Sequence, residues 1–194
     1  MMVKDLREKT GAGIMDCRRA LEESGGDVEK AVNLLRQRGL AAAARKTGRA
    51  TKEGLIVSYI HPGGRIGVLL EINCETDFVA KNNEFAALAK DLTMQIAATD
   101  PICITRGDLP PEMFEREEEI YRAQAKATGK PEKVIEKIVE GKLEKYYSEV
   151  CLLEQLFVKD PDITIENYVK GVISKFGENI TVRRFVRYQL GESL

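Results

Sequence analysis

The first forty residues place apolar side chains at helical spacing, in groups separated by short polar or glycine-rich breaks. Ile14, Cys17, Ala20 and Leu21 recur on one face of a helix. A second set follows a Ser-Gly-Gly-Asp break, and its members are Val28, Ala31, Val32 and Leu35. With a first helix around Leu6, the pattern predicts three short helices, the last capped by Asp27 and ended by Gly39.

From Gly54 the period of the pattern changes from about 3.6 to two. Residues 55–60 and 65–74 predict two strands joined by a His-Pro-Gly-Gly turn, with alternate residues of the second strand facing the core. A helix should follow, because the next apolar stripe has helical spacing: Phe85, Leu88, Ala89, Leu92 and Ile96. Between strand and helix lies the stretch Cys74-Glu75-Thr76-Asp77-Phe78-Val79-Ala80-Lys81-Asn82.

The remaining pattern adds short strands and charged helices. Proline is favoured in the first turn of a helix, so Pro111 and Pro131 each mark a helix start. Together they predict a pair of helices over about residues 111–147. On the first helix of this pair, we expect the buried residues to be Phe114, Ile120 and Tyr121. Strands are predicted at 102–104, 150–158 and 179–190, with a helix around 168–173. Clustered helices and a hairpin predict an α+β fold with an antiparallel sheet.

These elements divide the chain into three parts. Residues 1–39 form a small three-helix domain, and residues 40–53 form a basic, alanine-rich helix or linker. Residues 54–194 form the α+β core, including the charged helix pair.

Composition excludes several classes of protein. The 194 residues carry 30 Lys and Arg against 31 Asp and Glu, so no global field attracts nucleic acid or an anionic membrane. No apolar run is long enough to cross a bilayer, and the charged N-terminus lacks a signal-peptide core. The four scattered cysteines are typical of free thiols in a reducing compartment, so we expect a cytoplasmic protein.

Catalytic chemistry is poorly represented. The sequence has no phosphate-binding GxxxxGK[ST] motif and no GxGxxG motif after a strand, so we expect no nucleotide cofactor. Its single histidine, His61, lies on a Pro-Gly turn, which argues against a triad and against a Cys/His metal site. We therefore predict a protein that is not an enzyme, with no catalytic residues and no bound metal, and an enzyme that uses a pair of carboxylates is the alternative.

Two long motifs resemble the signatures of one family. Residues 3–21, which begin Val-Lys-Asp-Leu-Arg-Glu-Lys-Thr-Gly-Ala-Gly, resemble the opening signature of elongation factor Ts. Residues 72–80, Ile-Asn-Cys-Glu-Thr-Asp-Phe-Val-Ala, resemble its second signature. The resemblance continues to the terminal strand. The three-helix segment also resembles a ubiquitin-associated-type domain.

The resemblance implies a guanine-nucleotide exchange factor. Members bind elongation factor Tu in its GDP-bound and nucleotide-free forms, and they insert an Asp-Phe pair near its magnesium and phosphate site. On this chain that loop corresponds to Thr76, Asp77, Phe78 and Val79. The N-terminal helices also grip the GTPase, and the matching candidates are Arg7, Ile14, Met15, Arg18 and Lys46. Ile14 and Arg18 stand where relatives commonly have methionine and lysine.

The chain departs from longer members by having one core unit and no long coiled-coil insertion. Residues 59–68 resemble the hairpin of the second core copy in those members, which makes His61 a candidate contact of a second protomer. We expect a homodimer, paired through its sheets, that binds two molecules of the GTPase. No membrane and no direct nucleic-acid contact are expected.

Simpler interpretations stand beside these. Phe78 at a strand–helix junction is also typical of a core aromatic, and Asp77 is typical of a helix start. The chain also suits a ubiquitin-type or general protein-binding module that is fused to an α+β domain of another function. A third class is an RNA-binding protein that uses the basic run of Arg45, Lys46, Arg49 and Lys52.

Overall fold

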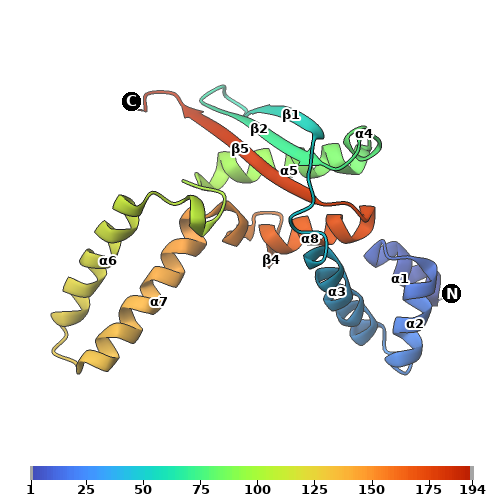
Figure 1. Cartoon of the computed structure of the whole chain (residues 1–194), viewed down its shortest axis with the longest axis horizontal. Helices are drawn as coiled ribbons and strands as arrows, with labels where there is room; N and C mark the ends of the chain where they lie inside the picture. The colour runs from blue at the N-terminus through green and yellow to red at the C-terminus, as the bar shows by residue number, and fades with distance from the viewer. Residues whose placement is uncertain (1, 193–194) are drawn as a thin grey trace. The chain divides into compact units, whose positions relative to one another are not determined.

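The computed structural model describes residues 2–192, which divide into two compact units. The first unit contains the described residues up to Ile56, with Glu71–Ala89 and Asn167–Arg183. The second contains Val57–Leu70, Lys90–Glu166 and the described residues from Arg184 onward. Figure 1 shows the elements of both, and the fold is the mixed helix-and-sheet class that the sequence predicts.

Three helices open the first unit: α1 (Met2–Thr10), α2 (Ile14–Glu23) and α3 (Val28–Ala44). Gly11 has a φ of 65°, which lets the chain turn sharply between α1 and α2. Asp27 caps α3 as predicted, because its carboxylate accepts a hydrogen bond from the Lys30 backbone N–H at 3.0 Å. The buried core of this bundle consists of Leu6, Cys17, Ala20, Leu21, Ala31 and Leu35.

The prediction that Gly39 ends the third helix is wrong. Helix α3 continues through Gly39 to Ala44, and its C-cap is Arg45 in the right-handed helical region. A Cβ atom at Gly39 would lie 3.0 Å from the Ser174 hydroxyl, so the glycine allows close packing within the helix. Gly39 therefore lets Ser174 approach α3 closely. The C-terminus of α3 forms without a residue in the left-handed conformation.

One sheet has three strands in the order β1-β2-β5, with residues from both units. They are β1 (Glu53–Ile60), β2 (Ile66–Cys74) and β5 (Ile180–Gln189), which confirms the predicted hairpin and terminal strand. Alternate residues of β2 are buried as predicted: Val68, Leu70, Ile72 and Cys74.

Helices precede and follow the strands of the three-stranded sheet. The four-residue helix α4 (Asp77–Ala80) comes directly after β2, and α5 (Asn83–Thr99) comes next. The predicted stripe of α5 is confirmed, since all five of its side chains are fully buried. Helix α8 (Ile165–Phe176) precedes β5.

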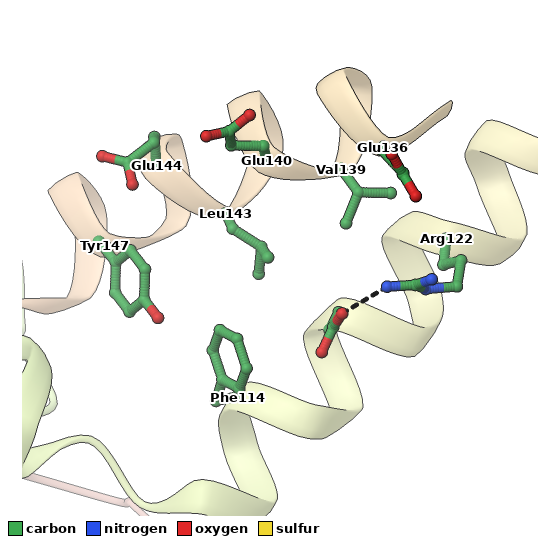
Figure 2. A pocket seen from close by; sticks show the side chains of 9 residues that line it. Phe114, Arg122, Glu136, Val139, Glu140, Leu143, Glu144 and Tyr147 are labelled. Carbon is green, nitrogen blue, oxygen red and sulfur yellow. Dashed lines mark hydrogen bonds and ion pairs between the residues drawn. The ribbon is translucent and has the colours of Figure 1, made fainter. Parts of the chain in front are cut away.

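The second unit contains a helical hairpin of α6 (Pro111–Lys126) and α7 (Glu132–Val150). A groove of about 240 Å³ lies between these helices, lined by apolar residues and by glutamates. Figure 2 shows the Phe114 and Leu143 side chains in the space between α6 and α7. The Arg106 guanidinium fixes the open end of the hairpin, because it donates to the carboxylates of Glu144 and Glu154 and lies 4.2 Å from the Tyr147 ring centroid.

Three sequence predictions for the second unit are wrong. No strand forms at 102–104, where Cys103 makes one isolated bridge to Cys151. The predicted strand at 150–158 is largely a 3-10 turn, η2 (Leu152–Glu154), followed by the two-residue strand β3 (Leu156–Phe157). Ile120 is 38% exposed, while Phe114 and Tyr121 are half-buried.

A buried polar network binds the two ends of β3 and keeps it short. Gln95 is fully buried, and its amide donates to the Gln155 side chain and to the Leu156 carbonyl, both at 3.1 Å. The Gln95 carbonyl oxygen accepts from the Val158 N–H at 2.9 Å. These side-chain bonds satisfy backbone groups that a longer strand would pair. Strand β3 then turns back against β4 (Asp160–Thr164) in an antiparallel pair.

Candidate partner-binding site

The first unit exposes a phenylalanine on the short helix α4. Thr76 has extended backbone angles (φ −128°, ψ 157°) and is the N-cap of α4. Phe78 is 83% exposed, the largest exposed fraction of any large apolar residue that the structure describes. Val79 and Ala80, the next two residues, are buried. The chain therefore points one large ring outward from a segment whose other apolar side chains face the core.

This arrangement contradicts the interpretation of Phe78 as a core aromatic. A core aromatic would be buried, as Phe85 is seven residues later. The Phe78 ring leaves most of its apolar surface in water, which carries a free-energy cost that a partner can recover by covering it. The ring is therefore accessible to another protein, and its docking role stays a prediction.

Asp77 is the first residue of α4, where an acidic side chain is favoured. Its carboxylate accepts a hydrogen bond from the Lys81 ammonium at 2.7 Å, one turn later. That bond and the charge of Lys81 lower the pKa of Asp77 and raise the pKa of Lys81. Asp77 is therefore a carboxylate at neutral pH, adjacent to the exposed ring of Phe78.

Buried groups support the segment just before α4. The Cys74 thiol is buried and donates to the Thr76 carbonyl at 3.2 Å. Burial is the main cause that raises the pKa of Cys74 to about 11. A thiol with this pKa stays protonated near neutral pH, so it acts as a hydrogen-bond donor and not as a nucleophile.

Sequence reasoning missed the residues that support this segment from elsewhere in the chain. Glu178 binds Thr76, while Asn179 binds Glu75, and both lie just before β5. The available signal was a polar Glu-Asn pair between a helix-ending Gly177 and an apolar strand. That local pattern does not predict which residue either of them binds.

The N-terminal candidates lie on α1 and α2 of the same unit. Ile14 and Met15 begin α2 and are 57% and 62% exposed, whereas the rest of the apolar stripe of α2 is buried. Arg18 is exposed and forms an ion pair with Glu22 at 2.9 Å, and Arg7 is exposed on α1. These two helices thus expose two neighbouring apolar side chains and two arginines.

The other two candidates have partners within their own units. The half-buried Lys46 donates its ammonium to the Gly177 carbonyl, just beyond α8. His61 belongs to the second unit, where it is exposed and its Nδ1 lies 3.1 Å from the Tyr59 hydroxyl. The structure gives Lys46 an intramolecular role, and contact of either residue with another protein stays a prediction.

The basic run of the linker is partly neutralised. Arg49 lies 3.6 Å from the Glu75 carboxylate, and Lys46 is bound as described. Within residues 2–192, no group of three or more His, Cys, Asp or Glu side chains is arranged to hold a metal ion. No helix of that described range has the length and apolarity needed to cross a bilayer.

Comparison with known proteins identifies the family. The model of the family described as Elongation factor TS matches residues 41–192. The chain belongs to the elongation factor Ts family. The match covers the linker, the sheet and the hairpin of this translation elongation factor, and it includes the segment around Phe78.

Curated relatives of the same name align over nearly the whole chain. Elongation factor Ts of Carboxydothermus hydrogenoformans is 62% identical over 193 residues, covering 100% of this chain and 89% of the relative. The proteins of Desulforamulus reducens and Geobacter sulfurreducens are 61% and 58% identical, each aligned over 89% of its own length. The alignments include the N-terminal helices, so the opening motif belongs to the same family as the core.

Proposed function

We propose that this elongation factor Ts family member promotes release of GDP from elongation factor Tu by docking Phe78 and Asp77 against the GTPase. The observation that carries the proposal is the 83% exposure of Phe78 on a segment held from its buried side. The exposed Ile14 and Met15 supply a second apolar contact from α2. The factor itself has no catalytic role in bond breaking, so it is an exchange factor and not an enzyme.

The mechanism follows from thermodynamic linkage. A protein accelerates GDP release only if it binds the nucleotide-free GTPase more tightly than the GDP-bound form. Covering the Phe78 ring contributes on the order of 1.5–3 kcal/mol. That free energy is available to stabilise a GTPase conformation with weakened phosphate and magnesium contacts. The Asp77 carboxylate adds a negative charge next to the ring, which opposes rebinding of phosphate at short range.

The direct test is release of a fluorescent GDP analogue from elongation factor Tu, measured by stopped flow with and without this protein. We expect release to accelerate with factor concentration and then to saturate. Binding of the factor without faster release would identify a general binding module and overturn the proposal. Because translation takes place in the cytoplasm, that is the compartment where we expect exchange to occur.

We propose further that two chains pair through the sheet. The second unit exposes Ile60, Leu69, Val186, Tyr188 and Leu190. Ile60 lies over Gly67, where an added Cβ would be 3.1 Å from the Ile60 Cδ1 atom, so Ile60 and Leu69 share the outer face of the hairpin. An exposed apolar sheet face of this kind favours association with a second copy.

Light scattering of the protein, alone and with elongation factor Tu, tests this dimer. We expect a mass of two chains alone and of a two-plus-two assembly with the GTPase. Leu69→Lys should shift the mass toward one chain by placing a charge in the interface. A wild-type mass of one chain in both samples would contradict the pairing.

A further inference from the structure

A single carboxylate binds Thr76, the residue just before α4. Glu178 accepts two hydrogen bonds from Thr76, one from its backbone N–H at 3.0 Å and one from its hydroxyl at 2.6 Å. Thr76 is the N-cap of α4, yet its hydroxyl does not cap that helix. The hydroxyl is directed instead to a residue 102 positions later in the chain.

The neighbours of Glu178 hold adjacent segments in the same way. The Asn179 backbone N–H donates to the Glu75 carboxylate at 2.6 Å, and its side-chain amide donates to the Arg49 carbonyl at 2.8 Å. The carbonyl of Gly177 accepts the ammonium of Lys46. Three consecutive residues between α8 and β5 therefore fasten both the linker and the segment before α4.

Helix α4 needs such support because it is too short to hold itself. Four residues form little more than one helical turn, and an isolated turn does not repay the cost of nucleation. The bond between Asp77 and Lys81 is exposed, so it adds little. Val79 and Ala80 anchor the buried side of α4, while Glu178 fixes its N-terminus.

We propose that Glu178 is a positioning residue for Phe78, which keeps the exposed ring in its docking orientation before the partner arrives. This inference rests on the exchange function proposed above. A side chain that is already ordered loses less conformational entropy when it binds, so positioning raises the effectiveness of the ring without any contact between Glu178 and the partner.

A double-mutant cycle separates positioning from general stabilisation. At a factor concentration below saturation, Glu178→Ala should slow release of fluorescent GDP at least about fivefold. In a Phe78→Ala background, where no ring remains to be positioned, the same change should slow release less than about twofold. Equal slowing in both backgrounds would show that Glu178 acts independently of the ring and would overturn the inference.

Two control sets keep the test decisive. Glu144→Ala removes another carboxylate held by two hydrogen bonds, both at 2.7 Å from Arg106 in the second unit, and should leave release unchanged. If Glu178→Ala does not fold, the cycle is run with Thr76→Val, which keeps volume and loses the hydroxyl. Thr76→Ser retains the hydroxyl and should restore release to within about twofold of wild type. Failure of Ser to restore it would count against the inference.

Hydrogen exchange of the free protein distinguishes failure of the inference from failure of the proposed function. The Thr76 and Ala80 amides are bonded to Glu178 and to the Thr76 carbonyl, respectively. Both should exchange faster in Glu178→Ala, and this result does not depend on elongation factor Tu. Faster exchange with no GDP release by wild type would refute the exchange function alone. Unchanged exchange at both amides would refute the positioning role.

Discussion

Replacing Phe78 with alanine should reduce nucleotide exchange strongly and leave the fold intact. The ring is 83% exposed in the free protein, so its removal takes little from the folded state, and we expect less than about 0.5 kcal/mol of lost stability. Burial of the ring against a partner contributes on the order of 1.5–3 kcal/mol. At one factor of ten per 1.4 kcal/mol, that range corresponds to a loss of about 10- to 150-fold.

The assay is GDP release from elongation factor Tu at a factor concentration below saturation, where the observed rate reports the free energy of the transition state relative to free proteins. Urea unfolding of the same samples measures stability. Release within about twofold of wild type, from a variant with an unchanged unfolding midpoint, would refute the docking role of the ring.

Two other residues of the chain serve as matched controls. Phe85→Ala removes the same ring from a fully buried position and should cost about 3–5 kcal/mol of stability. Leu156→Ala removes a 58% exposed apolar side chain from the second unit and should change neither stability nor release. If only Phe78→Ala slows GDP release without lowering stability, the slowing comes from loss of this exposed ring and not from loss of apolar surface in general.

Three further predictions concern stability and titration. Gly54→Ala should destabilise the protein by more than about 2 kcal/mol in urea unfolding, because the new Cβ would lie 2.1 Å from the Ile72 carbonyl oxygen and φ is 151°. Cys151 should resist thiol reagents in native protein up to about pH 9 and react in urea, because burial raises its pKa to about 12; rapid native labelling would contradict this. Lys81→Met should raise the pKa of Asp77 toward its ordinary value in an NMR titration, since the Lys81 hydrogen bond lowers it. With a lowered folded-state pKa, the pair stabilises the fold above the ordinary carboxyl pKa, and this contribution is lost as pH falls through the folded value.

Local sequence patterns determined most of the helices and sheet strands. The stripe that begins at Phe85 and the alternation in β2 have periods that only one element satisfies, and both sets are buried as predicted. Proline positions marked the starts of α6 and α7 for the same local reason, because proline lacks the N–H that a helix interior needs.

Local patterns failed where a distant group supplied the deciding contact. Gly39 resembles a helix end, and only the approach of Ser174 shows why glycine lies inside the helix. The apolar run at 150–158 is typical of a strand, but the amide of Gln95 takes the backbone partners that the strand needs. In both cases the competing interaction comes from a residue far away in the chain.

The candidate site shows the same division most clearly. The motif around Phe78 is visible in the sequence, and its resemblance to the family signature predicted a docking role. Only the folded chain shows that the ring faces solvent, and that the preceding residue Thr76 binds Glu178, 102 residues away. The spacing of residues within a segment determines which of them lie on the same face of a helix or strand. Burial depends on what the folded chain brings against that face, so tertiary structure decided it.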